Sequence, residues 1–278
     1  MDQVDASASQ NTLFARLPAL ARRGVGGLLD LVLPRRCAGC SAIVVADGGF
    51  CPDCWLKLDF LSGPACARCD IPFEVPQGEG ALCGACIADP PPFERVHVPI
   101  GYGPESRALV LRLKYGRRTG LARLMAQFIL PVLPERDGVG VTPPLLVPVP
   151  LHRWRIWSRG FNQSAEIARA LGRRTGLPLD VGALVRTRST APLRGLGGKA
   201  RAKMVRGAFS VPAAARPRIK DRNIYLVDDV FTSGATASAC ARALLRAGAA
   251  RVAVVAFTRV VRRDEGGDID SLTFDTDI

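Results

Sequence analysis

Eight of the nine cysteines form four Cys-x-x-Cys pairs in the N-terminal part of the chain. Two residues between the cysteines of a pair let both thiolates point at one metal ion, and two pairs complete the tetrahedral sulfur site that zinc favours. The spacing therefore predicts two structural Zn²⁺ sites, each closed by four thiolates and without an open position for catalysis. The predicted ligands are Cys37, Cys40, Cys51, Cys54, Cys66, Cys69, Cys83 and Cys86.

Two alternatives for these cysteines stay open at this point. Gaps of ten, eleven and thirteen residues between successive pairs fit two consecutive ribbons, but an interleaved pairing would also complete two sites. A disulfide scaffold is the competing interpretation, but it belongs to exported proteins, and residues 24–34 lack the features of a signal peptide. The ninth cysteine, Cys240, stands alone in a helical pattern and is predicted to be a small buried side chain.

A second group of residues suited to chemistry follows the apolar run 224–227, where Asp228 and Asp229 are adjacent. The hydroxyl-rich stretch 232–236 comes next and leads into an alanine-rich helical pattern. The N-terminus of a helix favours a phosphate, because its amides are unpaired and the helix dipole is positive there. Two adjacent carboxylates can accept hydrogen bonds from vicinal hydroxyls. The stretch therefore predicts a sugar-phosphate site, against the alternative of an acidic turn followed by an ordinary helix cap.

The string YLVDDVFTSGAT at 225–236 resembles the phosphoribosyl-pyrophosphate (PRPP) motif of type I phosphoribosyltransferases. The resemblance implies that Asp228 and Asp229 bind the ribose hydroxyls and that Mg²⁺ accompanies PRPP. Residues that the resemblance assigns to the 5′-phosphate are Thr232, Ser233, Gly234, Ala235 and Thr236.

Three further segments, 113–118, 147–164 and 186–209, resemble ComF-type competence proteins. Proteins of that family couple an N-terminal cysteine ribbon to a phosphoribosyltransferase domain. The resemblance implies a cytoplasmic protein of natural transformation, with PRPP, single-stranded DNA and competence-machinery proteins as its partners. It also places a pyrophosphate loop after the strand at 145–150, where the planar guanidinium of arginine suits phosphate oxygens. The candidates for binding pyrophosphate are His152, Arg153, Arg155, Arg159 and Lys114.

The segment 188–206 resembles the flexible loop that closes over the site in this fold, and its glycines suit a lid. It departs from the family pattern at two positions. Leu193 stands where glutamine is common, and Met204 stands where asparagine is common. The contacts of this lid are therefore not predicted.

Strands that alternate with helices predict an α/β fold with a parallel sheet. The resemblance implies that this is the type I phosphoribosyltransferase fold, behind a small N-terminal zinc-ribbon module with four-cysteine sites. Because ligands bind at the carboxyl ends of parallel strands, the acids after 224–227 would lie at a binding edge. Predicted strands cover 95–102, 145–150, 184–185, 224–227 and 251–257, and predicted helices cover 105–117, 119–133, 161–176 and 234–247, with Asn162 or Ser164 as the N-cap of the third.

Four regions are predicted along the chain. They are an N-terminal segment with an amphipathic helix at 1–36, a double zinc ribbon at 37–90, a phosphoribosyltransferase-like domain at 91–263 and an acidic disordered tail at 264–278. No apolar stretch reaches the roughly 18 residues that span a bilayer.

The charge is +13 overall and is unevenly placed. The segment 151–206 holds thirteen lysines and arginines against two acids, and this favours a polyanionic partner. Three functions therefore stay open: a phosphoribosyltransferase with an unknown acceptor, a nucleic-acid-binding protein, and a PRPP-sensing module without turnover. Aromatic residues for stacking bases are sparse, since Trp154, Trp157 and Phe161 form the only cluster.

Overall fold

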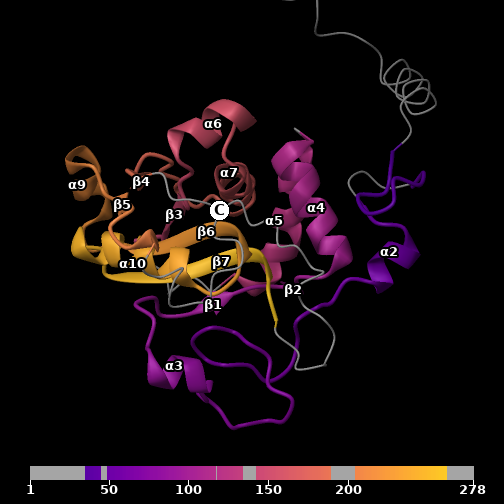
Figure 1. Ribbon diagram of the computed structural model, residues 1–278, viewed down its shortest axis with the longest axis horizontal. Coiled ribbons are helices and arrows are strands. Elements are labelled where there is room, and N and C mark those ends of the chain that lie inside the picture. The colour runs from indigo at the N-terminus through magenta and orange to yellow at the C-terminus, as the bar shows by residue number, and fades with distance from the viewer. Residues whose placement is uncertain (1–34, 45–48, 117, 134–141, 189–203, 262–278) are drawn as a thin grey trace, which may run out of the picture. The chain divides into compact units, whose positions relative to one another are not determined.

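The computed structural model describes residues 35–44, 49–116, 118–133, 142–188 and 204–261 (Figure 1). The chain divides into two compact units, residues 1–51 and residues 52–278. The predicted N-terminal helix, the acidic tail and most of the predicted lid, including Leu193, lie outside the described residues. No helix in the described segments is long and apolar enough to cross a membrane.

A five-stranded sheet forms the centre of the second unit, and every strand pair in it is parallel. The strand order is β1-β7-β6-β3, and β2 pairs with the end of β7. This arrangement confirms the α/β class and the parallel sheet that the sequence predicts. The strands are β1 (Val96–His97), β2 (Ile100–Gly101), β3 (Leu145–Pro148), β6 (Asn223–Phe231) and β7 (Arg251–Arg259).

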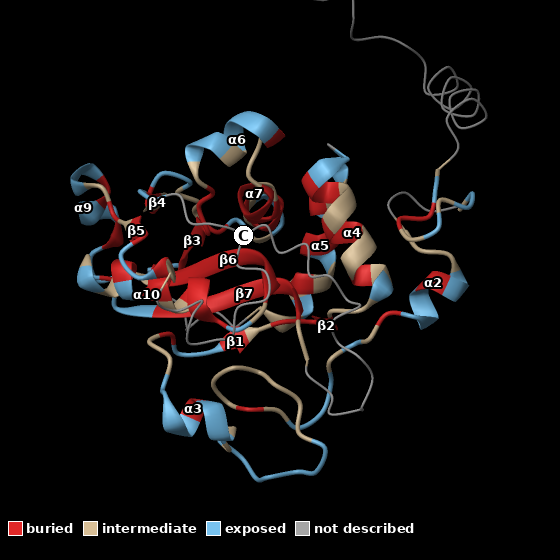
Figure 2. Ribbon diagram, viewed as in Figure 1, coloured by how far each residue is buried: buried red, intermediate tan, exposed pale blue. Residues whose placement is uncertain are grey.

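Helices cover this sheet, and the central strands β6 and β7 are buried along almost their whole length (Figure 2). Helices α5 and α7 pack on each other and on strands β3, β6 and β7, whereas α10 packs on β6, β7 and β5. Continuous apolar strands are typical of a parallel sheet that is covered on both faces. The longer helices are α4 (Pro104–Tyr115), α5 (Gly120–Ile129), α7 (Gln163–Thr175) and α10 (Ala235–Arg246).

Helix α7 begins at the asparagine that was one of its two predicted caps. The Asn162 side chain accepts a hydrogen bond from the backbone N–H of Ser164 at 3.0 Å, as an N-cap does. The helix ends at Gly176, whose φ of 70° is a left-handed conformation that glycine adopts without steric cost. Because Asn162 takes the capping role, the hydroxyl of Ser164 is available for a different contact.

Strand β6 differs from its prediction in a way that matters for the site. The strand continues to Phe231, so Asp228 and Asp229 lie inside it and the predicted strand end at Val227 was wrong. Val230 and Phe231 continue the ladder with β7, because both are strong strand formers. The acids therefore belong to a buried strand rather than to an exposed turn.

The remaining elements are short. The segment expected to be a loop after β3 forms helix α6 (Arg153–Arg159), which ends at Gly160 with φ of 83°. The predicted strand at 95–102 is split into β1 and β2 around Pro99. The other elements are β4 (Val185–Arg186), which pairs antiparallel with β5 (Phe209–Ser210), the helices α2 (Pro52–Leu56), α3 (Gly84–Ala88) and α9 (Arg216–Ile219), and the 3₁₀ turns η1 (Leu130–Val132) and η2 (Ala213–Ala215).

Candidate functional site

The eight paired cysteines form two clusters in consecutive order, which settles the pairing that the sequence left open. One cluster holds Cys37, Cys40, Cys51 and Cys54, and the other holds Cys66, Cys69, Cys83 and Cys86; within each, the sulfurs lie within 4.8 Å of one another. The cysteines are free, and sulfur–sulfur distances of 3.6–3.7 Å exceed the roughly 2.05 Å of a disulfide.

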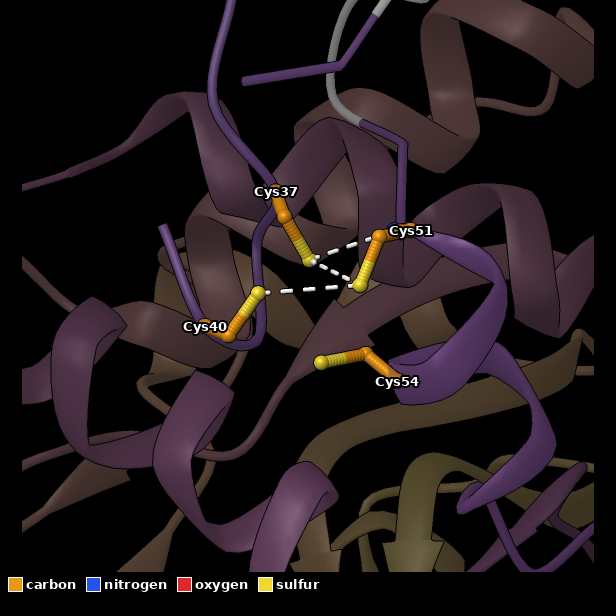
Figure 3. Close-up of side chains that lie close together, drawn as sticks. All are labelled: Cys37, Cys40, Cys51 and Cys54. Carbon is orange, nitrogen blue, oxygen red and sulfur yellow. Dashed lines mark hydrogen bonds between the residues drawn. The ribbon is translucent and has the colours of Figure 1, made fainter. Parts of the chain in front are cut away.

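The spacing of the sulfurs fits a zinc ion. Zinc–sulfur bonds of about 2.3 Å place the corners of a tetrahedron about 3.8 Å apart. In the first cluster the Cys37–Cys51 sulfurs are 3.7 Å apart and the Cys40–Cys51 sulfurs are 3.6 Å apart, and the four side chains point toward a common centre (Figure 3). Both clusters therefore have the donors and the geometry of closed structural zinc sites.

The two clusters repeat the same backbone design. Cys37 and Cys66 each accept a sulfur hydrogen bond at 3.3 Å, from the backbone N–H of Cys51 and Cys83 respectively. Burial acts to raise the pKa of both thiols, but these backbone donors and their neighbours outweigh it and lower each pKa to about 6. Backbone donors of this kind favour the thiolate form, which is the form that binds zinc.

The acid pair lies in a buried polar cluster on β6, apart from the cysteines in the sequence. Asp228 is 5% exposed and Asp229 is 1% exposed. The Oδ1 atom of Asp228 accepts hydrogen bonds from Ser164 Oγ at 3.1 Å and from the Asp229 N–H at 2.9 Å. Ser164 therefore does not cap α7, and its hydroxyl contacts the acid pair instead.

Lys114 supplies the counter-charge to this pair. It projects from the last turn of α4, is 1% exposed, and its Nζ lies 2.9 Å from Asp229 Oδ2. Side chains alternate across a strand, and Ile224 and Leu226 face the core cluster that contains α10. Asp229 consequently faces away from that cluster, toward the side from which Lys114 reaches it.

Arg159 brings a second buried cation to the same place. It is 8% exposed, and its guanidinium contacts Gln163 Oε1 at 3.5 Å and Tyr115 Oη at 3.4 Å, with its carbon 5.1 Å from the centre of the Tyr115 ring. Its charge also helps to lower the pKa of Asp229. The ends of α4, α6 and α7 therefore meet at the acids of β6.

The two carboxyl groups titrate differently. Burial and the adjacent Asp229 carboxylate raise the pKa of Asp228 well above its ordinary value. Burial also acts to raise the pKa of Asp229, but the charge and hydrogen bond of Lys114 outweigh it, so this pKa is lowered. The pKa of Asp228 is thus shifted up and that of Asp229 down, although both acids lie beside the same buried cations, Lys114 and Arg159.

The predicted phosphate loop follows directly on the same strand. Thr232 and Ser233 are partly or fully exposed, and Gly234 has φ of 74° and precedes α10, which has twelve residues. Thr236 lies in the first turn of α10 and is 9% exposed. This loop therefore places backbone amides and hydroxyls at the N-terminus of a helix, which is an arrangement that can hold a phosphate.

Known proteins resemble this chain both in its cysteine-rich segment and over most of its length. Residues 28–87 match the double zinc ribbon domain. The DNA utilization protein YhgH of Escherichia coli K12 is 33% identical over 227 residues, covering 81% of this chain and 90% of YhgH. Competence protein F of Haemophilus influenzae is 28% identical over 229 residues, covering 81% of this chain and 96% of that protein. The chain belongs to the ComF family.

Solved structures similar to this ComF family member include the glutamine PRPP amidotransferase from B. subtilis complexed with ADP and GMP. That likeness has 21% identity and a TM-score of 0.30, and it covers 49% of this chain and 25% of the amidotransferase. The protein TT1426 from Thermus thermophilus has 18% identity and a TM-score of 0.28, and the likeness covers 57% of this chain and 88% of TT1426. At these TM-scores neither likeness supports a conclusion about this chain.

The five pyrophosphate candidates of the ComF resemblance separate into two groups. Lys114 and Arg159 lie in the buried cluster beside the acids. Arg153 is exposed at the start of α6, whereas His152 and Arg155 are half-buried there. The sequence reasoning named Ser164 only as a possible helix cap and did not single out Gln163, although both stand in the segment 147–164 and both side chains are buried here.

Proposed function

We propose that this ComF family member binds PRPP, or a related ribose phosphate, at the carboxyl end of β6. We further propose that it does so in the cytoplasm, where it takes part in the handling of single-stranded DNA during natural transformation together with competence-machinery proteins. Zinc in the double ribbon at 37–90 would be structural.

One observation carries the ligand proposal: three separate parts of the chain converge on an acid pair that is followed at once by a phosphate-type loop. Lys114 Nζ and Ser164 Oγ already donate to, or pair with, the two carboxyl groups. Two vicinal ribose hydroxyls could take over these positions, since a hydroxyl is also a donor. The 5′-phosphate would then lie at 232–236, at the N-terminus of α10.

The same arrangement would support transfer chemistry if an acceptor binds. Phosphoribosyl transfer breaks the bond between C1 and pyrophosphate, and cations stabilise the charge that develops on the leaving group. Lys114, Arg159 and the α6 residues Arg153 and Arg155 would supply these cations, and His152, which precedes α6, is the remaining candidate for contacting pyrophosphate. Mg²⁺ would enter on the ligand's phosphates, as it commonly does in phosphate sites. Pyrophosphate release measured with a panel of acceptors separates a transferase from a PRPP sensor.

The ligand proposal predicts the effect of neutralising the acid pair. Isothermal titration with PRPP and Mg²⁺ should give a measurable Kd for the wild type. The double variant Asp228→Asn/Asp229→Asn should bind at least about tenfold more weakly, because losing hydrogen bonds to a charged acceptor costs about 1.5 kcal/mol or more. The control is Glu94→Gln, which changes an exposed carboxylate. Absence of binding by the wild type would refute the ligand proposal.

A second candidate function, direct binding of single-stranded DNA, is favoured by the surface of α6. Trp154 is 63% exposed and Trp157 is 81% exposed, and their rings lie edge to face with centroids 6.3 Å apart. Arg153 is exposed beside them. Exposed aromatic rings next to basic side chains are the combination on which unstacked bases and phosphates bind.

Removing these two rings should weaken DNA binding. The variant Trp154→Ala/Trp157→Ala is expected to lose about 1–3 kcal/mol per stacked base, with little change in the dependence on salt. Arg153→Gln should instead lower the salt slope by about one phosphate contact. Fluorescence anisotropy of a labelled single strand across a salt series measures both effects. Arg123→Gln on α5 is the control for loss of an exposed charge. Equal DNA binding by the wild type and the three variants would show that α6 is not part of the DNA interface.

A further inference from the structure

Arg259, the last residue of β7, joins the second cysteine cluster to the sheet. It is only 3% exposed although it carries a charge. One terminal nitrogen of its guanidinium donates a hydrogen bond to the backbone carbonyl of Cys69, a predicted zinc ligand. Its guanidinium carbon also lies 5.5 Å from the centre of the Phe231 ring, within the range of a cation–π contact. A single side chain therefore contacts both the metal knuckle and the end of β6.

The Phe231 ring in turn lies against the phosphate loop. A Cβ atom built on Gly234 would come within 3.0 Å of Cζ of this ring, so the ring fills the space next to the turn. Phe93 packs edge-on against the same ring at 6.0 Å and 82°. Phe231 is thus held between Arg259 and Phe93, and its free edge supports Gly234. A shift of the ring would move the backbone whose amides precede α10.

The knuckle that holds Arg259 is itself fixed to the first strands of the sheet. The carboxylate of Asp70 accepts a hydrogen bond from the Val98 N–H at 3.3 Å, and the carbonyl of Arg68 accepts one from the Val96 N–H at 2.9 Å. Arg68 and Asp70 flank Cys69 in the sequence. A metal ion bound by Cys66, Cys69, Cys83 and Cys86 would fix the direction of the Cys69 carbonyl.

We infer that Arg259 is a positioning residue, through which the second zinc ribbon orders the loop at 232–236 for a ligand phosphate. The path runs from the Cys69 carbonyl to Arg259, then through the Phe231 ring to Gly234. The inference rests on the proposed function, because the phosphate at this loop is part of that proposal. It adds that the ribbon contributes to ligand affinity without touching the ligand.

The test compares two arginines at opposite ends of β7. Arg259→Met removes the contact with Cys69, whereas Arg251→Met removes an exposed side chain at the start of the same strand. In the full-length zinc-loaded protein, Arg259→Met should bind PRPP with Mg²⁺ about tenfold more weakly, which corresponds to about 1.4 kcal/mol. Amide hydrogen exchange should quicken at 232–236 and stay unchanged at 223–227. Arg251→Met should match the wild type in both measurements.

A second variant keeps the test informative if Arg259→Met does not fold. Phe231→Leu retains an apolar side chain and the Arg259–Cys69 contact, but it removes the ring that supports Gly234. Amide exchange at 232–236 should therefore also quicken in this variant, while its zinc content stays at the wild-type value. Exchange that is equal in Phe231→Leu and the wild type would overturn the inference. If the wild type binds no PRPP, the ligand proposal is refuted. The comparison of amide hydrogen exchange at 232–236 between Arg259→Met and the wild type still decides whether the ribbon orders this loop.

Discussion

Lys114→Met is expected to destabilise the protein by about 3–5 kcal/mol, because it leaves Asp229 buried without its counter-charge. Both side chains of the pair are 1% exposed and their charged atoms are 2.9 Å apart. Removing one member of such a pair costs far more than the pair contributes net, since the remaining charge keeps its desolvation penalty. Urea denaturation followed by circular dichroism at neutral pH measures the change in the free energy of unfolding.

A double-mutant cycle separates this cause from a simple packing defect. Lys114→Met/Asp229→Asn removes both charges, so it should recover much of the stability lost in the single variant. Lys57→Met, at an exposed position, should change stability by no more than about 0.5 kcal/mol. If Lys114→Met and the double variant lose equal stability, the ion pair is not the source of the effect.

The stability of Lys114→Met relative to the wild type should depend on pH. The folded-state pKa of Asp229 is lowered, so its contribution to stability is present above the ordinary pKa of an aspartate and is lost as the pH falls through the lowered value. Asp228, with its raised pKa, acts in the opposite sense, and its contribution is lost as the pH rises. Loss of Lys114 removes the largest of the causes that lower the pKa of Asp229, so the stability gap between Lys114→Met and wild type should narrow below about pH 4.

Removal of zinc is the second change with a large expected effect. Structural zinc contributes about 10–16 kcal/mol of apparent binding free energy in zinc-finger peptides, and the ribbons have few other sources of stability. Most side chains at 74–80 are exposed, and helices α2 and α3 have five residues each. Chelation under reducing conditions should therefore unfold the ribbons and expose 52–90 to proteolysis, whereas strands β6 and β7 should resist.

Metal analysis supplies the stoichiometry and the control. The intact protein should contain about two zinc ions per chain, and Cys83→Ser should lower this to about one. Cys240→Ala is the matched control, since Cys240 is 0% exposed within α10 and belongs to neither cluster. A protein that binds no zinc after reduction, or that keeps two zinc ions in Cys83→Ser, would contradict the assignment.

Predictions from the sequence were most accurate where the chemistry of a site requires a particular spacing of residues. The Cys-x-x-Cys pairs define the ligands of both clusters, because the knuckle geometry depends on local backbone alone. The end of α7 at Gly176 and its cap at Asn162, one of the two predicted caps, were equally local signals. The parallel sheet followed from the alternation of apolar strands with helical patterns.

Features that depend on distant residues were harder to predict. The acids at 228–229 interrupt the apolar pattern that marks a strand, so the strand was ended too early although Val230 and Phe231 continue its ladder. Nothing local shows that Lys114 is buried, because its counter-ion lies on a strand far along the chain. Helix α6 was missed because arginine and tryptophan in a short segment give no clear apolar period.

Because Lys114 and Asp229 already contact each other, binding of the proposed sugar at this site would be an exchange of partners rather than an addition. A ligand hydroxyl that takes the place of Lys114 Nζ or Ser164 Oγ replaces a contact that the protein already has, so the net affinity reflects a small difference between two sets of contacts. The displaced ammonium also needs a new anion, because a buried lysine without one is costly. A ligand that brings two hydroxyls and a nearby phosphate meets both requirements, whereas an uncharged nucleoside meets only the first.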